Sequence, residues 1–202
     1  MCMTKVISVD DVDVVEQVVE VLKSGGIVMH PTETCYGLAC DVFNEEAVQE
    51  IYDIKRRDAK NPMSIMVAGR CMAMLYGDFP ISVNDIMSKY WPGALSILVP
   101  RKVFLPEYFN RGSGFVAIRY SDDYLCTSIV NQFGRPIVTT SANVAGNACL
   151  YKPDVSVFGK NASLIDLVVD GGDIEENKPS TIIKVVGDDV EVVRRGSVVI
   201  QR

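Results

Sequence analysis

The most chemically distinctive stretch of the sequence is "HPTETCYGLACD", His30 to Asp41, in which two threonines, a glutamate, a tyrosine and a glycine follow a short apolar run. A basic cluster lies at the end of a helical pattern and consists of Lys55, Arg56 and Arg57. Guanidinium groups bind phosphate oxygens in pairs, and an ammonium adds a compact positive charge. The cluster therefore suits an anion such as a phosphate, although cations at a helix C-terminus also complement the helix dipole.

Further polar residues fall where predicted strands begin or end, and ligands of α/β sheets gather at strand ends. Each has an ordinary alternative role in an ion pair, a turn, a cap or a hairpin edge. Arg119, for example, could pair with Asp122 or Asp123 on the surface. The set as a whole is Thr34, Arg119, Thr139, Ser141, Asn143, Ser180 and Arg194.

Several common chemistries are disfavoured. A serine or cysteine triad needs a base, and the chain has one histidine, His30, at the end of an apolar run, where we predict a structural imidazole. Neither a P-loop nor a Rossmann glycine pattern is present. The six cysteines are scattered without a C-x-x-C pair, so we predict reduced, mostly buried thiols and no metal site.

The elements that must position these residues can be predicted from periodicity. An amphipathic helix with a serine cap is predicted over 8–26, and a buried strand over 27–30 leads into the His30–Asp41 motif. Asn44 is predicted to cap a second helix, 45–57. The apolar stripes of the two helices are Val12, Val15, Val19 and Leu22 in the first, and Val48, Ile51 and Ile54 in the second.

The rest of the chain alternates between strand and helix patterns. Strands are predicted at 95–100, 115–120 and 136–143, with a serine-capped helix at 121–134 between the last two. The β-branched run at 180–196, broken by a Gly-Asp turn, predicts a hairpin. We therefore expect one α/β (α+β) domain spanning 1–202, built on a mixed sheet, with no repeat or linker.

Charge and hydropathy narrow the function further. The net charge is −6 and the pI is near 4.9, which disfavours a surface built to hold nucleic acid, although an acidic surface can surround a basic cleft. No apolar segment approaches the roughly 20 residues that a membrane helix needs, and the N-terminus lacks a signal peptide's apolar region. We expect a cytoplasmic protein without a membrane partner.

An ordered set of short motifs resembles the YrdC or TsaC type of threonylcarbamoyl-AMP synthase in its short, single-domain form. The resemblance covers nearly the whole chain. It implies a YrdC-like twisted mixed β-sheet flanked by helices, with a deep, positively lined cavity. The motifs are "PTETCYGL", "IKRR" followed by "NP", "WPGALSILV", "VAIR", "TTSAN", "PSTII" and "VRRG".

The resemblance implies a nucleotidyltransferase that forms threonylcarbamoyl-AMP and pyrophosphate from L-threonine, bicarbonate and ATP. The product would serve t6A37 biosynthesis in tRNA through a separate tRNA threonylcarbamoyl transferase, with weak tRNA binding at most. Mg²⁺ would arrive with ATP and not in a protein site. By position, ATP would meet Lys55, Arg57, Asn61, Ser141, Asn143 and Arg194, with Lys55 and Arg57 catalytic, and threonine would meet Thr34, Arg119, Thr139 and Ser180.

Five positions depart from the common family pattern. Met66 stands where many members carry a histidine beside threonine, Phe115 replaces a frequent threonine near ATP, and Cys149 replaces a frequent serine. Ala145 and Tyr120 also differ from the usual serine and proline. The cationic and "SAN" elements are intact, so these changes bear on substrate selectivity.

Two alternative functions come from other classes. An RNA-binding module would use a basic concave surface and would bind tRNA in a salt-dependent way without ATP turnover. A carbamoyl-transfer subunit, as in hydrogenase maturation, would normally bring acylphosphatase-like and zinc-finger segments, for which the chain has neither the length nor the zinc ligands.

Overall fold

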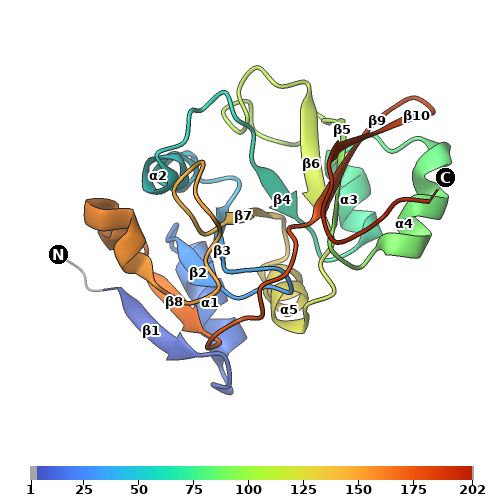
Figure 1. Cartoon of the computed structure of the whole chain (residues 1–202). Helices are drawn as coiled ribbons and strands as arrows, with labels where there is room; N and C mark the ends of the chain where they lie inside the picture. Colours follow the sequence, from blue (N-terminus) through green and yellow to red (C-terminus); the bar gives the residue numbers. More distant parts are fainter. Residues whose placement is uncertain (1–3, 202) are drawn as a thin grey trace.

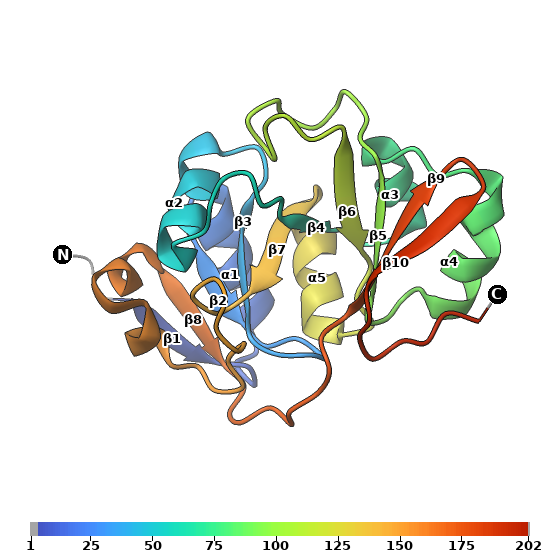
Figure 2. The ribbon, with the colours of Figure 1, turned by 45° about the horizontal axis from the view of Figure 1, so that its top comes forward.

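A computed structural model describes residues 4–201 of the chain (Figure 1). All ten of its strands join one mixed sheet in the order β1-β8-β2-β3-β7-β4-β6-β5-β9-β10. The first strand and the last hairpin therefore lie at opposite edges of the sheet, as Figures 1 and 2 show. The mixed α/β class with helices beside a twisted sheet is confirmed, and the single-domain assignment for 1–202 stays a prediction.

The strands are short, and most are separated by a helix or a long connection. They are β1 (Lys5–Ser8), β2 (Val28–His30), β3 (Gly37–Asp41), β4 (Ser64–Met66), β5 (Leu95–Pro100), β6 (Phe115–Arg119), β7 (Ile137–Ser141), β8 (Leu167–Asp170), β9 (Thr181–Val186) and β10 (Asp189–Arg194). The helices are α1 (Val14–Lys23), α2 (Glu45–Lys55), α3 (Arg70–Tyr76), α4 (Asn84–Tyr90) and α5 (Tyr124–Phe133), with 3-10 segments η1 (Ile81–Val83) and η2 (Val155–Leu164).

The alternation of side chains along the strands divides the core between the two faces of the sheet. Val28 and Ala39 pack with α1 and α5, whereas their neighbours Met29 and Leu38 pack with α2 on the other face. Figure 2 shows α1 and α5 behind the central strands. Because strands β2 and β3 are covered on both sides, every one of their residues is buried, and the sheet is a rigid support for the loops at its ends.

The N-terminal prediction needs two corrections. Ser8 does not cap α1: it ends β1, a strand that pairs in parallel with β8 and that the sequence analysis missed. Val12 is fully exposed, because the helix begins only at Val14, and the buried face consists of Val14, Val18, Val19 and Leu22. The strand was missed because its own burial pattern is mostly exposed, and its partner lies far along the chain.

The second predicted helix is confirmed, with a shorter C-terminus. The Asn44 side chain accepts a hydrogen bond from the Ala47 amide at 3.0 Å, as expected of an N-cap. The helix ends at Lys55, since Arg56 adopts a left-handed conformation with φ of 47°. Arg57 therefore lies outside the last turn, on a backbone that has changed direction.

Later elements also agree with the sequence except at one cap. The strands β5, β6 and β7 and the β9–β10 hairpin are confirmed. Asp123, and not Ser121, caps α5 by accepting a hydrogen bond from the Cys126 amide at 2.8 Å. No helix among residues 4–201 is long and apolar enough to cross a membrane.

Candidate active site

A cavity of about 310 Å³ lies where several strands begin or end. The register of the sheet explains the convergence, because Gly37 of β3 lies opposite Ser141 of β7, and Thr139 lies opposite Ser64 of β4. Arg119 ends β6, which pairs directly with β4. The wall includes Thr32, Thr34, Cys35, Tyr36, Arg57, Met63, Ser96, Arg119, Thr139, Thr140, Ser141, Asn143, Asn147, Cys149, Pro179, Ser180, Ile182 and Arg194.

The structure brings most of the predicted site residues together, although they are spread over 161 positions of sequence from Thr34 to Arg194. Those that line the cavity are Thr34, Arg57, Arg119, Thr139, Ser141, Asn143, Ser180 and Arg194. Lys55 and Asn61 are not part of its wall. The functional roles of all ten residues stay predictions, and so does the depth of the cavity.

Thr32 shapes the corner that carries Thr34. Its Oγ1 donates a hydrogen bond to the Cys35 carbonyl at 2.7 Å and accepts from the Thr34 amide at 3.1 Å and the Cys35 amide at 3.2 Å. These contacts form a side-chain-stabilised turn of the kind that threonine favours. The turn holds the Thr34 hydroxyl 3.1 Å from Thr32 Oγ1 at the edge of the cavity.

Arg119 lies beside Thr34 in the cavity wall and is held there by Glu33. Its Nη2 lies 2.5 Å from Glu33 Oε1 and 3.3 Å from Thr34 Oγ1. Burial alone would raise the pKa of Glu33, but the charge of Arg119 and the hydrogen bonds from Ser121 and Arg119 outweigh it, so the pKa is below its ordinary value. The Arg119 Nε is buried and has no hydrogen-bond partner among residues 4–201.

Lys55 supports the wall from behind. The residue is 1% exposed, and its Nζ donates to the carbonyl oxygens of Ser141 and Asn143 and to Asn143 Oδ1, the last at 2.8 Å. The Asn143 amide in turn donates to the Asn147 carbonyl at 2.6 Å. Burial, with the nearby charge of Arg57, lowers the pKa of Lys55 to about 7. This lysine therefore fixes the 141–147 loop.

Arg57 stabilises a turn and also lines the cavity. Its Nε donates to the Asn61 carbonyl at 3.0 Å and its Nη2 to the Pro62 carbonyl at 2.8 Å, which closes the turn between α2 and β4. The guanidinium still forms part of the cavity wall. Asn61 contributes its carbonyl oxygen to this arrangement, while the residue itself is exposed.

Arg194 and Ser180 form the remaining wall. Arg194 donates from Nε and Nη2 to the Ser180 carbonyl, at 3.0 and 2.8 Å, and from Nη2 to the Ser180 hydroxyl at 3.0 Å. Arg194 ends β10 and Ser180 precedes β9, so the hairpin brings them together. With Arg57 and Arg119, three arginines line a cavity whose other polar side chains are hydroxyls, amides and two thiols. The positive charge of such a wall suits an anion.

Two residues that hold the cavity wall in place, Glu33 and Thr32, were not predicted as site residues from the sequence. Glu33 and Thr32 lie inside the motif that the sequence singled out, but their partners depend on the fold, since Glu33 and Arg119 are 86 residues apart. Arg119 pairs with Glu33 and not with Asp122 or Asp123, which corrects the surface alternative. His30 is buried as predicted, with Nδ1 2.9 Å from the Pro31 carbonyl, but its Nε2 has no partner among the described residues.

Three of the residues that depart from the family pattern differ in whether they line the cavity. Met66 is fully buried in the core with α1 and α5 and does not line the cavity. Phe115 also lies outside the wall, and Lys184 Nζ is 4.7 Å from the centre of its ring. Cys149 lines the cavity, where its Sγ is 3.3 Å from the Tyr151 hydroxyl. Of these three changes, only Cys149 can contact a molecule in the cavity directly.

The mixed sheet and the arginine-lined cavity place the chain in the class of α/β proteins that gather polar side chains at strand ends, with a positive wall that suits an anion. Within that class, the Sua5/YciO/YrdC family model, which is described as "Telomere recombination", matches residues 20–196. The chain belongs to this family.

Curated relatives carry a consistent name. A protein of Methanocaldococcus jannaschii named "Putative threonylcarbamoyl-AMP synthase" is 33% identical over 196 residues, which cover 93% of this chain and 89% of the relative. The "Threonylcarbamoyl-AMP synthase" of Bacillus subtilis is 31% identical over 183 residues, or 90% of this chain. The match spans 52% of the Bacillus protein, so this chain corresponds to about half of that relative.

Solved structures share the fold. A variant of Sua5 from Pyrococcus abyssi superposes with a TM-score of 0.87 at 26% identity, covering 96% of this chain and 61% of that one. A second P. abyssi Sua5 structure, complexed with L-threonine, gives a TM-score of 0.83 at 24% identity, covering 97% of this chain and 57% of that one. The latter likeness supports the fold alone.

Proposed function

We propose that this protein is an L-threonylcarbamoyladenylate synthase, which makes threonylcarbamoyl-AMP and pyrophosphate from L-threonine, bicarbonate and ATP. The observation that carries the proposal is one cavity in which Arg57, Arg119 and Arg194 stand among hydroxyl groups. The names of the M. jannaschii and B. subtilis relatives support the same reaction. A substrate pair with one carboxylate and a triphosphate matches a wall of separated guanidinium groups.

The cavity divides into two parts in this proposal. Threonine occupies the part beside Thr34, Arg119, Thr139 and Ser180, where Arg119 receives the α-carboxylate in a paired hydrogen bond. ATP lies along Arg57, Ser141, Asn143 and Arg194. Lys55 contributes through the 141–147 loop, since its three oxygen acceptors already occupy the ammonium group. Asn61 contributes through the backbone oxygen that holds Arg57.

The reaction needs no protein nucleophile. The threonine amine combines with bicarbonate to form a carbamate with loss of water, and a carbamate oxygen then attacks the α-phosphorus of ATP. The bond to the bridging oxygen breaks, and its electron pair leaves on pyrophosphate. In this step the protein positions the two substrates and stabilises the charge that develops on the phosphates. Arg57 and Arg194 supply that positive charge.

We propose that Mg²⁺ enters the site bound to ATP. Carboxylate oxygens are the usual protein ligands of Mg²⁺, and the described residues that line the cavity include no aspartate or glutamate. This composition supports the proposal that Mg²⁺ is held by the phosphates of ATP. The ion's arrival with ATP stays a prediction.

The proposed product implies a downstream partner. A mixed anhydride such as threonylcarbamoyl-AMP is reactive, so we propose that a separate tRNA threonylcarbamoyl transferase consumes it, in the cytosol, for t6A37 biosynthesis. Any tRNA binding by this chain itself is expected to be weak, because its net charge is −6.

Incubation of the pure protein with MgATP, bicarbonate and each amino acid in turn tests the proposal. We expect pyrophosphate release and a nucleotide with the mass of threonylcarbamoyl-AMP, dependent on both L-threonine and bicarbonate. Omission of either, and a boiled sample, are the controls. Absence of product together with tight, salt-dependent tRNA binding would favour the RNA-binding alternative, and a carbamoylated acceptor without threonine would favour the carbamoyl-transfer alternative.

A further inference from the structure

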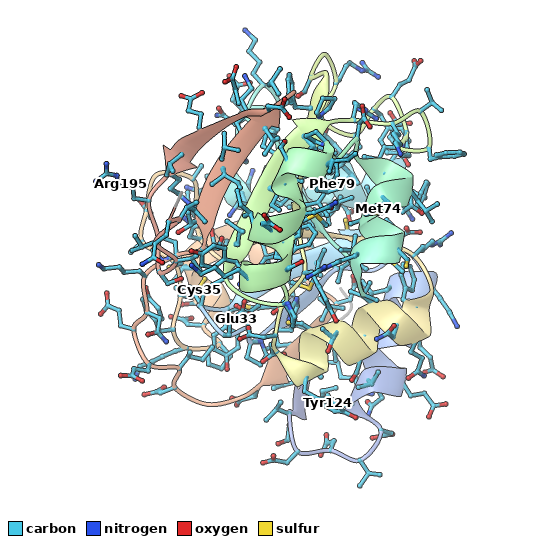
Figure 3. All side chains as sticks on the ribbon, turned by 90° about the vertical axis from the view of Figure 1, so that its right-hand side faces the viewer. Glu33, Cys35, Met74, Phe79, Tyr124 and Arg195 are labelled. Carbon is cyan, nitrogen blue, oxygen red and sulfur yellow. The ribbon has the colours of Figure 1, made fainter. Side chains whose placement is uncertain are left out.

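The Arg119 guanidinium contacts the carboxylate of Glu33, a residue to which the proposed reaction assigns no role. Glu33 Oε1 lies 2.5 Å from Arg119 Nη2, and the Glu33 side chain is 20% exposed. Glu33 does not line the cavity, whereas Arg119 does. The carboxylate therefore contacts the guanidinium without being part of the cavity wall itself. Figure 3 labels Glu33 beside Cys35, one of the residues of the wall.

Glu33 is itself fixed by a short chain of hydrogen bonds. The Ser121 hydroxyl donates to Glu33 Oε2 at 2.6 Å, and the same hydroxyl accepts a bond from the Asp123 amide at 3.2 Å. Ser121 is fully buried. Asp123 caps α5, which Tyr124, labelled in Figure 3, begins. The position of Glu33 is thereby tied to the N-terminus of a helix that packs in the core.

These contacts leave part of the guanidinium free. Glu33 and Thr34 both engage Nη2, while Nε is buried and has no partner among residues 4–201. A buried donor without a partner is unfavourable unless something else satisfies it. A guanidinium anchored at one nitrogen is held in a fixed orientation, which favours its binding of the substrate carboxylate.

From this geometry we propose that Glu33 is a positioning residue for substrate carboxylate recognition, acting through Arg119 with Ser121 as its support. The inference rests on the proposed function, because the carboxylate that Arg119 receives is that of the amino-acid substrate. Glu33 holds the orientation of Arg119 before the substrate arrives, so less ordering is needed on binding. It also offsets one of the three positive charges of the wall.

The test compares Glu33→Ala and Glu33→Gln with the unchanged protein. We expect Glu33→Ala to raise the KM for L-threonine by about tenfold or more, because a charge-assisted contact is lost, with the KM for ATP changed less than about twofold. Glu33→Gln keeps an oxygen acceptor for Arg119 but no charge, so its effect should be intermediate. Ser121→Ala should change the threonine KM in the same direction by a smaller factor.

A matched control is Asp122→Asn, which neutralises an exposed acid beside the same segment and should leave both KM values unchanged. Thermal unfolding of each variant verifies the fold. Three results would overturn the inference: an unchanged threonine KM in Glu33→Ala, a lowered one, which would mean that Glu33 competes with the substrate, or equal increases for threonine and ATP.

Calorimetric titration with L-threonine alone separates this inference from the proposed reaction. If the unchanged protein binds threonine but releases no pyrophosphate, the synthase proposal fails, and the affinity of Glu33→Ala for threonine still decides the role of Glu33. If pyrophosphate is released and Glu33→Ala binds threonine normally, only the role of Glu33 fails. An unchanged protein that neither binds threonine nor turns over would overturn both.

Discussion

Arg57 could have a structural role, a catalytic role or both, since it closes the α2–β4 turn and also lines the cavity. If it only closes the turn, Arg57→Ala should cost stability while turnover of the folded protein continues. If it also stabilises the departing pyrophosphate, we expect Arg57→Ala to lower the rate by roughly 10²-fold or more with the fold retained.

The measurement is threonine- and bicarbonate-dependent pyrophosphate release without tRNA, beside thermal unfolding. Arg57→Lys should recover part of the rate, because an ammonium supplies charge without the planar fork. Arg56→Ala is the matched control, since Arg56 is an exposed neighbour in the same basic cluster and does not line the cavity. Near-normal pyrophosphate release by folded Arg57→Ala would remove Arg57 from the chemistry.

Arg119 gives a prediction that separates binding from stability. Arg119→Ala should raise the threonine KM far more than the ATP KM, because a charged hydrogen bond is worth about 1.5–3 kcal/mol. It also leaves the Glu33 carboxylate partly buried without its cation, so the variant should be less stable. Adding Glu33→Gln to it should restore part of the stability and none of the threonine affinity. A double variant that regains normal threonine affinity would contradict the assigned role.

Elements whose signals are local could be predicted from the sequence, and those that depend on distant partners could not. The Asn44 cap, the apolar face of α2 and the β9–β10 hairpin all rest on residues close together in sequence. In contrast, β4 is only three residues long and exists because β6 and β7 flank it. The site follows the same rule. Thr34 and Arg57 could be predicted from their motifs, but the role of Glu33 depends on its contact with Arg119, which lies 86 residues away.

The connection between α2 and the loop after β7 gives a prediction at the level of elements. Lys55, the last residue of α2, donates to two carbonyls and one side-chain oxygen of 141–143, and its own carbonyl accepts from the Ala145 amide at 2.8 Å. Lys55→Met removes the side-chain contacts, so the two half-buried carbonyl oxygens lose the ammonium donor while Asn143 Oδ1 keeps its bond from the Ser141 hydroxyl, and the loss costs about 1–3 kcal/mol. The loop should therefore open more easily.

Hydrogen exchange measures that opening. We expect faster exchange at Ala145 and Leu150 in Lys55→Met, with little change in α1, and an increased KM for ATP. Lys60→Met, a change of the same type at an exposed lysine, is the control. Unchanged exchange in the loop, together with lost turnover, would instead favour direct contact of Lys55 with ATP.

At the scale of the whole molecule, the buried lysine couples folding to pH. Burial lowers the pKa of Lys55 from its ordinary value of 10.5 to about 7, so between these two values the unfolded chain binds more protons than the folded one. The free energy of unfolding then rises with pH across this window, and the cost of the buried charge is fully present below pH 7. The slope approaches about 1.4 kcal/mol per pH unit for one group.

Lys55→Met lacks this ionisation, so the comparison isolates it from thiols and phenols that titrate in both proteins. From pH 7 to pH 9, we expect the unfolding free energy of the unchanged protein to rise by about 2 kcal/mol relative to that of Lys55→Met. Urea unfolding at several pH values, with a constant ionic strength, measures both curves. Parallel curves across this window would mean that Lys55 stays protonated, because its three oxygen acceptors stabilise the ammonium form more than burial opposes it. The lysine would then be a fixed positive charge behind the proposed nucleotide site and would not titrate near neutral pH.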